Sequence, residues 1–214
     1  MKLYSYWRST TSYRVRAALN LKGVAYETVP VDLVAGDQRS REYTALNPGA
    51  GVPTLVLDDG TVLTQSMAIL EYIDATWPGP RLIPADALTR AQVMAAAHTV
   101  ALDIHPVNNL RLIAQLKTRF GATPEQAQDW MCHWMVQGFS ALEAQLDPDT
   151  AFAFGHKPDL ADLCIVAQCY NARRWGVALG DFPKVARIEA ACLKVPAIAA
   201  AHPDQQPDAA IPAS

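Results

Sequence analysis

The chain has 214 residues, of which 50% are hydrophobic and 18% charged, and its formal net charge at pH 7 is −3. A chain of this length and hydrophobicity can bury a sizeable core, which excludes global disorder, and it suffices for one large domain or two small ones. The acidic balance, with no basic run and no aromatic residues interleaved with basic ones, argues against a nucleic-acid ligand. Any attraction for an anionic ligand must therefore come from a local site.

Targeting signals and metal-ligand patterns are both missing from the sequence. The first four residues enter a strand pattern directly, which leaves no room for a signal peptide. No apolar run reaches the roughly 18 residues that suggest a membrane span, so we expect a cytoplasmic protein that does not bind membranes. The histidines lack ligand spacing such as His-Glu-x-x-His, and no metal site is predicted. The cysteines form no Cys-x-x-Cys pair and are expected to be free and buried: Cys132, Cys164, Cys169 and Cys192.

The first 80 residues alternate between strand and helix patterns. They predict a strand, a helix, a strand, a short helix, two hairpin strands and a helix, at residues 3–6, 12–22, 25–31, 37–45, 54–57, 62–63 and 65–76. Gly23 stands where the residue after a helix C-cap belongs, and Asp58-Asp59-Gly60 is a strong turn signal. This order of elements is that of a thioredoxin-like α/β domain, assigned to residues 1–80.

Beyond this domain the pattern becomes helical. Trp77-Pro78-Gly79-Pro80 and Pro84 interrupt regular structure and indicate a linker. No convincing strand follows, and helical segments are predicted at residues 88–120, 124–146, 160–175 and 182–193. The proline-rich tail from His202 is expected to fray. An all-helical second domain is therefore assigned to residues 88–214.

Hydroxyl side chains gather where the first strand meets the first helix. Ser9, Thr10, Thr11 and Ser12 can simply cap the helix, or they can face an anion together with the exposed N–H groups of its first turn. The segment alone does not decide between these two interpretations. Two further segments bear on the choice: Gly51-Val52-Pro53-Thr54-Leu55 and Leu63-Thr64-Gln65-Ser66-Met67-Ala68-Ile69.

Together these segments resemble the glutathione site of the zeta class of glutathione transferases, which contains maleylacetoacetate isomerase and maleylpyruvate isomerase. The class signature Ser-Ser-Cys-Ser/Ala-x-Arg-Val-Arg is matched by Ser9, Ser12, Arg14, Val15 and Arg16. Thr10 replaces the second serine and Thr11 replaces the cysteine. Loss of this cysteine puts in doubt whether the enzyme can be inactivated through a thiol at this position. The resemblance spans nearly the whole chain. It implies a thioredoxin-like α/β domain joined to an all-α domain, glutathione as cofactor, and a homodimer.

Glutathione is an anionic tripeptide with a thiol, and each of its parts needs a partner. Its γ-glutamyl carboxylate suits a helix N-terminus, which Gln65-Ser66 supplies. Its cysteinyl backbone suits an edge strand. The family resemblance implies a cis peptide at Val52-Pro53, which would turn the N–H and C=O of Val52 outward. Its thiol needs a hydroxyl that favours the thiolate, for which Ser9 and Thr11 are the candidates. The resemblance implies the following glutathione contacts: Ser9, Thr10, Thr11, Gln38, Val52, Pro53, Gln65, Ser66, His105, Asn109 and Arg111.

A polar segment interrupts the first long helical pattern of the second domain. Pro106 removes a backbone donor and is expected to kink the helix, with His105, Asn109 and Arg111 close by. An exposed polar turn with a core histidine is the alternative interpretation. In zeta proteins the matching segment contributes to the glutathione site.

The resemblance also implies the reaction. The substrates of these isomerases are dianionic keto acids; a thiolate adds to the double bond, the bond rotates, and elimination releases the trans isomer. The enolate that forms needs preplaced positive charge, and arginine binds carboxylates with a planar fork. We assign this role to Arg8, Arg111 and one of Arg173 or Arg174. The resemblance favours Arg174, because the family places an arginine just before the aromatic residue that Trp175 occupies, and Arg173 is then interpreted as a solvated helix charge. Arg14 and Arg16 are interpreted as structural, paired with acidic neighbours or with the other subunit.

The sequence thus predicts a glutathione-dependent cis-trans isomerase of a maleyl keto acid in the catabolism of aromatic compounds, with maleylacetoacetate or maleylpyruvate as substrate. The alternatives are a conventional glutathione transferase that conjugates small electrophiles, and a non-catalytic module on the same fold. A tyrosine-dependent transferase, using Tyr4 or Tyr6, is a further alternative. Asp159 and Asp162 resemble a helix N-capping box and are assigned to folding.

Overall fold

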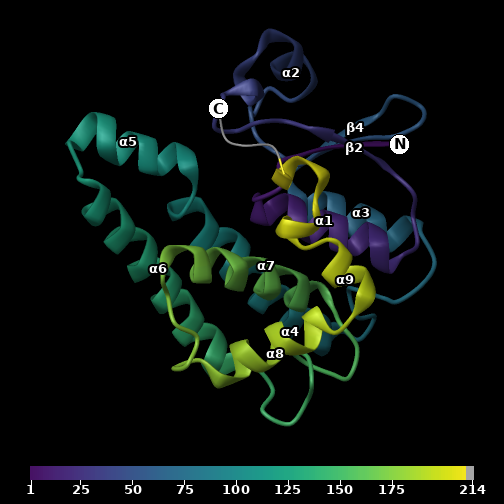
Figure 1. Cartoon of the computed structure of the whole chain (residues 1–214). Helices are drawn as coiled ribbons and strands as arrows, with labels where there is room; N and C mark the ends of the chain where they lie inside the picture. Colours follow the sequence, from purple (N-terminus) through teal and green to yellow (C-terminus); the bar gives the residue numbers. More distant parts are fainter. Residues whose placement is uncertain (211–214) are drawn as a thin grey trace. The chain divides into compact units, whose positions relative to one another are not determined.

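The computed structural model describes residues 1–210. Its contacts divide the chain into two compact units (Figure 1). The sheet unit comprises Met1–Leu82 together with the chain from Leu193 onward, and the helical unit comprises Ile83–Cys192. The predicted combination of a thioredoxin-like α/β unit with an all-helical unit is confirmed.

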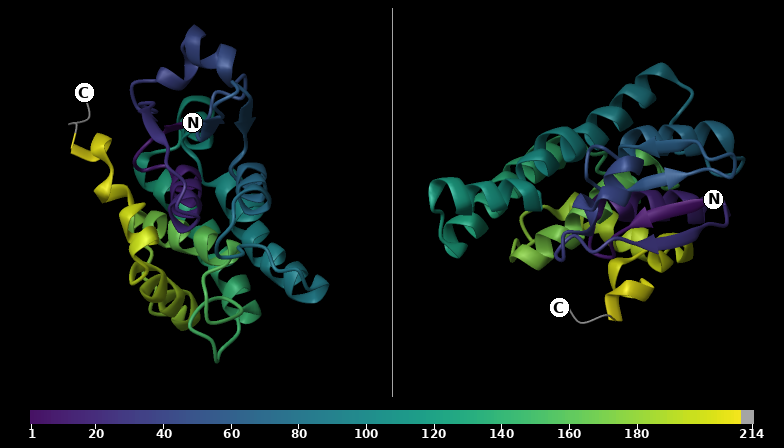
Figure 2. Two further views of the ribbon diagram at one scale, coloured as in Figure 1. Left: turned by 90° about the vertical axis from the view of Figure 1, so that its right-hand side faces the viewer. Right: turned by 90° about the horizontal axis from the view of Figure 1, so that it is seen from above.

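The sheet unit contains a four-stranded mixed sheet in the order β2-β1-β3-β4. Its elements are β1 (Lys2–Ser5), α1 (Thr10–Leu21), β2 (Glu27–Pro30), the 3-10 helix η1 (Asp37–Arg39), α2 (Arg41–Leu46), β3 (Thr54–Val56), β4 (Val62–Thr64) and α3 (Ser66–Thr76). β1 pairs with β2 in parallel, as the intervening α1 crossover requires, and with β3 antiparallel. α1 and α3 lie side by side (Figure 2). Each predicted element of this region is present with ends that differ by at most two residues, except that the short helix predicted at residues 37–45 is divided into η1 and α2.

A buried ion pair joins α1 to α3. The Lys22 ammonium lies 2.9 Å from the Asp74 carboxylate, and the two side chains are 2% and 5% exposed. Lys22 also donates to the carbonyl of Trp77 at 3.2 Å, and Asp74 accepts from the backbone N–H of Leu82 at 2.8 Å. One charge pair therefore fixes the ends of both helices and the linker that follows α3.

The C-terminal segment packs on α1 of the sheet unit, contrary to its assignment to the second domain. α9 (Pro196–Ala200) runs along α1 (Figure 1). Arg16 donates to the carbonyls of Ala201 and Trp7, both at 3.1 Å, and to the Ser5 hydroxyl at 2.9 Å. The partners of Arg16 are therefore carbonyls and a hydroxyl rather than the acids that the sequence suggested.

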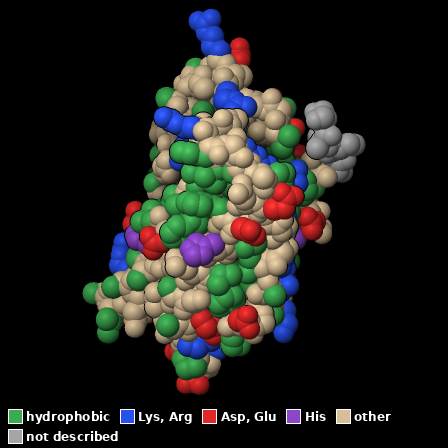
Figure 3. Space-filling model, turned by 90° about the vertical axis from the view of Figure 1, so that its left-hand side faces the viewer, with side chains coloured by type: hydrophobic (Ala, Val, Ile, Leu, Met, Phe, Trp, Pro, Cys, Tyr) green, Lys and Arg blue, Asp and Glu red, His purple; other side chains and the backbone are tan. Residues whose placement is uncertain are grey.

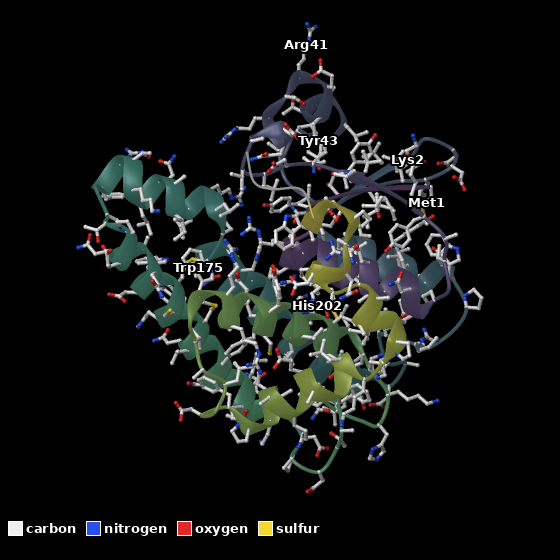
Figure 4. The ribbon with its side chains drawn as sticks, viewed as in Figure 1. Met1, Lys2, Arg41, Tyr43, Trp175 and His202 are labelled. Atoms are coloured by element: carbon white, nitrogen blue, oxygen red, sulfur yellow. The ribbon has the colours of Figure 1, made fainter. Side chains whose placement is uncertain are left out.

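The expected fraying of the tail is wrong for the described part, and residues 211–214 lie outside it. Two 3-10 helices, η4 (Pro203–Gln205) and η5 (Pro207–Ala210), continue the segment. Asp208 is buried and accepts a hydrogen bond from the backbone N–H of Trp7 at 2.9 Å. The ring of Tyr13 meets that of His202, labelled in Figure 4, edge-on at 5.8 Å. These contacts, which hydropathy does not reveal, hold the tail in place.

The helical unit is built from α4 (Ala87–His98), the π-helical turn η2 (Thr99–Ile104), the 3-10 helix η3 (His105–Val107), α5 (Leu110–Phe120), α6 (Pro124–Gln145), α7 (Leu160–Trp175) and α8 (Pro183–Leu193). The prediction of one kinked helix over 88–120 is wrong, because the chain breaks into separate helices around Pro106. Asn108 follows the break and is buried. Its amide donates to the Met131 carbonyl at 3.0 Å and its oxygen accepts from Asn171 at 2.7 Å, so hydrogen bonds to α6 and α7 stabilise the break.

The predicted capping box at the start of α7 is confirmed. Asp159 accepts from the N–H groups of Ala161 and Asp162, and Asp162 accepts from those of Ala153 and Asp159, both at 2.8 Å. Burial raises the pKa of Asp159 to about 6 and that of Asp162 well above its usual value. The backbone hydrogen bonds compensate part of this desolvation. Both acids serve folding.

Gly138 permits close packing of α6 against η2. A methyl group added at Gly138 would overlap Cγ1 and Cδ1 of Ile104, whose side chain is 1% exposed and has little room to move. We expect Gly138→Ala to lower the free energy of unfolding by about 1–3 kcal/mol through overpacking, despite alanine's better helix propensity. Urea denaturation measures this loss. Adding Ile104→Ala should recover part of it; an unchanged stability of Gly138→Ala would contradict the close contact.

The surface mixes charges of both signs. On the face shown in Figure 3, Lys and Arg side chains are interspersed with Asp and Glu, and hydrophobic side chains reach the surface between them. In residues 1–210 we find no helix that is both long and apolar enough to cross a membrane. Within the same residues, no three His, Cys, Asp or Glu side chains gather into a metal-binding group.

Candidate functional site

The hydroxyl groups at the start of α1 form a directed chain of hydrogen bonds. The N–H of Ser12 donates to Ser9 Oγ at 3.1 Å, which makes Ser9 the N-cap of α1. Ser9 Oγ lies 2.8 Å from Thr11 Oγ1, which donates to the carbonyl of Val52 at 2.9 Å. Because the Thr11 proton is given to the carbonyl, the Ser9 hydroxyl must donate to Thr11. The capping interpretation is therefore confirmed for Ser9, whereas the interpretation as an anion site stays a prediction. The Ser9 proton faces another hydroxyl, from which it can turn to a stronger acceptor.

The peptide between Val52 and Pro53 is cis, as the resemblance implied. The carbonyl of Gly51, just before it, accepts from the Tyr43 hydroxyl at 2.6 Å and from the Asn47 amide at 2.8 Å. Tyr43 (Figure 4) comes from α2. Neither support was predicted from the sequence, although Asn47-Pro48-Gly49 is a recognisable turn signal, in which the Asn47 side chain also accepts from the Gly49 N–H at 2.9 Å. Two side chains thus hold the loop that presents Val52.

Both polar backbone groups of Val52 were expected to face outward. The N–H makes no hydrogen bond with any residue from 1 to 210. The carbonyl, in contrast, already accepts from Thr11, which corrects half of the expectation. The N–H and the remaining lone pair of the carbonyl are what an extended peptide could pair with.

The start of α3 is open to an anion. Its N-cap Gln65 is exposed, has φ = 68°, and supplies no capping hydrogen bond, and the first turn holds no acidic residue. Ser66, the first helical residue, is 6% exposed. The N–H groups at the first turn of a helix and the helix dipole favour an anion here. Nη1 of the buried Arg14 lies 3.5 Å from Ser66 Oγ.

Three other predicted residues belong to the same unit. Thr10 is buried as the first residue of α1. Gln38 donates to the Leu33 carbonyl at 3.4 Å, while its buried Oε1 has no partner among the described residues. Arg8 stacks with its guanidinium carbon 4.5 Å from the centre of the Trp7 ring and donates to the Tyr6 hydroxyl at 3.1 Å. Tyr6 is therefore engaged in holding Arg8.

The helical unit carries the remaining predicted residues. His105 begins η3, and Asn109 caps α5 by accepting from the Leu112 N–H at 3.0 Å while donating to the Pro106 carbonyl at 2.9 Å. Asn109 is thus already engaged in capping. Arg111 is exposed and makes no hydrogen bond or ion pair with the described residues.

The two arginines near the end of α7 have different partners. Arg173 binds the Glu189 carboxylate through Nε at 2.9 Å and 3.1 Å. Its side chain is exposed, as expected for a solvated helix charge, and it is also an ion-pair partner. Arg174 is exposed, with its guanidinium carbon 5.3 Å from the centre of the Trp175 ring (Trp175 is labelled in Figure 4).

Within the sheet unit, three groups could bind the parts of glutathione. A hydroxyl stands at the start of α1, an unpaired N–H precedes the cis proline, and an uncapped helix N-terminus lies beside a buried arginine. These are partners for a thiol, a peptide backbone and a carboxylate. The donors present fit an anionic tripeptide thiol.

Comparison with known proteins points to the same group. Residues 1–75 match the family model for the glutathione S-transferase N-terminal domain. The chain is 45% identical to maleylacetoacetate isomerase of Pseudomonas aeruginosa over 210 residues, 97% of this chain and 98% of that protein. A holo maleylpyruvate isomerase, described as a bacterial zeta-class glutathione S-transferase, superposes with a TM-score of 0.94 at 43% identity, covering 97% of this chain and 99% of that one.

A maleylacetoacetate isomerase from Methylobacterium extorquens with bound malonate and glutathione also gives a TM-score of 0.94, at 38% identity over 97% of this chain and 98% of that one. The similarity is thus high and nearly full-length in both sequence and structure. It follows that the chain belongs to the maleylacetoacetate and maleylpyruvate isomerases, the zeta class of the glutathione S-transferases.

Proposed function

We propose that this protein is a glutathione-dependent cis-trans isomerase that converts maleylacetoacetate or maleylpyruvate to the fumaryl isomer in the catabolism of aromatic compounds. The observation that carries the proposal is the set of donors in the sheet unit. Ser9, the Val52 N–H and the start of α3 at Ser66 match the thiol, backbone and carboxylate of glutathione. The named relatives, similar over 97% of this chain, support the assignment.

The sheet unit binds and orients the cofactor. Ser66 and the first turn of α3 hold a carboxylate, and the N–H of Val52 pairs with the peptide backbone. The hydroxyl of Ser9 turns from Thr11 to the sulfur and stabilises the thiolate. Thr11 stays bonded to the Val52 carbonyl, since leaving it would break a contact that fixes the loop.

The chemistry requires positive charge near the substrate. When bound, glutathione supplies the thiolate that adds reversibly to the cis double bond. Arg8, Arg111 and Arg174 bind the carboxylates and stabilise the negative charge that develops on the keto oxygen. Stacking on Trp7 limits the motion of Arg8. Arg111, exposed and unpaired within the described residues, is available for an anion.

A conventional transferase that conjugates small electrophiles is the second candidate. The same glutathione-binding groups would serve it equally well. An apolar electrophile, however, gives Arg111 and Arg174 nothing to bind, which favours the isomerase. The family resemblance also supports a cytoplasmic homodimer, and a monomeric mass in light scattering at micromolar concentration would exclude the dimer.

Replacing the proposed thiolate partner tests the function. Ser9→Ala should lower kcat/KM for maleylacetoacetate or maleylpyruvate by roughly 10–100-fold, the value of a hydrogen bond to a charged group. It should also reduce the ultraviolet absorbance of the bound thiolate at neutral pH. Thr11→Ser, which keeps the hydroxyl bonded to the Val52 carbonyl, is the matched control and should retain most of the activity. Isomerisation by the wild-type protein must be present and must depend on added glutathione; its absence would refute the proposal.

A further inference from the structure

Arg14 is a buried cation whose charge the described structure does not neutralise. Its side chain points from α1 toward α3, and the residue is 1% exposed. Nε and Nη2 have no hydrogen-bond partner among residues 1–210. None of the ion pairs among those residues involves Arg14. A guanidinium stays charged when buried, and a buried charge is costly unless it is paired.

The neighbouring Arg16 shows what a purely structural arginine looks like in this fold. It lies two residues further along the same helix and is also fully buried. Its Nε, Nη1 and Nη2 all donate, to the carbonyls of Ala201, Tyr6 and Trp7 and to the hydroxyl of Ser5. The guanidinium of Arg16 is saturated by the protein, whereas two of the three nitrogens of Arg14 are not.

The charge of Arg14 adds to that of a helix N-terminus. Its Nη1 is 3.5 Å from the hydroxyl of Ser66, the first residue of α3. α3 has 11 residues, no capping side chain and no acid in its first turn, and the first turn of α1 holds no acid either. The charge of Arg14 and the positive end of the α3 dipole therefore meet at Ser66, and the first turns of α1 and α3 contribute no carboxylate that would offset them. Such an arrangement is stable when an anion binds there.

The direction of the hydrogen bond determines what Ser66 can do. The guanidinium can only donate, so Ser66 Oγ accepts from Nη1 and keeps its own proton free. This proton is then available to an acceptor on the side of the hydroxyl that faces away from Arg14. A hydroxyl that accepts from a cation is a stronger donor to an anion on its other side.

We propose that Arg14 is a positioning residue for the carboxylate subsite at the start of α3: it orients the Ser66 hydroxyl and supplies the buried charge behind it. The inference rests on the proposed function, because the carboxylate is taken to be that of the γ-glutamyl group of glutathione. Arg14 acts through the Ser66 hydroxyl and through the electrostatic field of its guanidinium. It strengthens the binding only of ligands that carry this carboxylate.

A chemical double-mutant cycle tests the coupling. The two ligands are glutathione and γ-aminobutyryl-cysteinyl-glycine, which lacks only the α-carboxylate of the γ-glutamyl group. Calorimetry on the wild-type protein should show that loss of the carboxylate weakens binding about 100-fold, as for a charge-assisted hydrogen bond. In Arg14→Met, loss of the carboxylate from the ligand should weaken binding about tenfold or less. In Arg14→Lys the loss of affinity should lie between those of wild type and Arg14→Met.

The stability of the ligand-free protein gives a second readout. Removing an unpaired buried cation should leave the Tm of Arg14→Met unchanged or higher, while the increase in Tm on adding glutathione becomes smaller. A structural role would instead lower the Tm, and a failure of Arg14→Met to fold would count in the same way. Arg41, an exposed arginine that projects from the start of α2 (Figure 4), provides the control Arg41→Met, which should change neither readout.

The possible results separate the two proposals. Suppose that wild type binds glutathione and that removing the carboxylate from the ligand weakens binding by the same factor in Arg14→Met as in wild type. Arg14 is then uncoupled from the subsite and the inference is overturned, while the proposed function stands. If wild type does not bind glutathione at millimolar concentration, the proposed function itself fails.

Discussion

Replacing Lys22 with methionine is expected to lower the free energy of unfolding by about 3 kcal/mol, since breaking a buried ion pair leaves a desolvated charge behind. Methionine keeps the unbranched length of the side chain and removes the ammonium. The Asp74 carboxylate, 5% exposed, then loses the cation 2.9 Å away, and the Trp77 carbonyl loses its donor. Urea denaturation followed by tryptophan fluorescence, with unchanged m-value, measures the difference.

A surface pair on the same unit provides the matched control. Lys2 and Glu27 lie 3.7 Å apart with side chains 52% and 62% exposed. Lys2→Met should change stability by less than about 1 kcal/mol, because solvent screens an exposed pair. Equal effects of Lys2→Met and Lys22→Met would show that burial does not strengthen the inner pair.

Replacing Arg111 with methionine is expected to reduce kcat/KM for isomerisation by roughly 30–200-fold, the value of about 2–3 kcal/mol for a charge-assisted pair with substrate. Glutathione binding should change much less. Arg111→Lys should restore only part of the rate, because lysine keeps the charge and loses the planar fork. Steady-state kinetics with maleylacetoacetate and maleylpyruvate, together with calorimetry for glutathione, measure both effects.

The same variants separate the isomerase from the transferase. Conjugation of a neutral electrophile should be nearly indifferent to Arg111→Met. Arg119, an exposed arginine in the last turn of the same helix, supplies the control Arg119→Met, which should leave both activities intact. Full isomerase activity in both Arg111 variants would remove Arg111 from the mechanism.

Local patterns were sufficient to predict the elements of the sheet unit. Alternation, the turn at Asp58-Asp59-Gly60 and the glycine after α1 all act within a few residues, and the elements follow. The conformation of the chain around Pro106 could not be predicted in detail, because its π-helical and 3-10 turns depend on hydrogen bonds between Asn108 and residues of α6 and α7. The order of the tail was hidden for a similar reason: its contacts with Arg16 and Trp7 join residues far apart in the chain.

In the candidate site, too, features set by neighbouring residues could be predicted, whereas features set by distant residues could not. Ser9 and Ser66 could be placed at helix starts from the sequence, and the resemblance implied the cis peptide at Val52. The sequence could not reveal that Thr11 holds the Val52 carbonyl or that Asn109 caps α5. Hydrogen-bond partners depend on the rotamer of each side chain, which tertiary packing sets.

The packing of the C-terminal segment on α1 means that the sheet unit is not continuous in the chain. Arg16 is synthesised before the helical unit, but one of its acceptors, the Ala201 carbonyl, is synthesised after it. The sheet unit therefore completes its contacts only after the helical unit has been synthesised. A fragment that ends at Leu82 contains all four strands but lacks the C-terminal segment that packs on α1. Separating the two units therefore requires two breaks in the coding sequence, one on each side of the helical unit. Alternatively, a circular permutation that places the C-terminal segment before Met1 would make the sheet unit continuous.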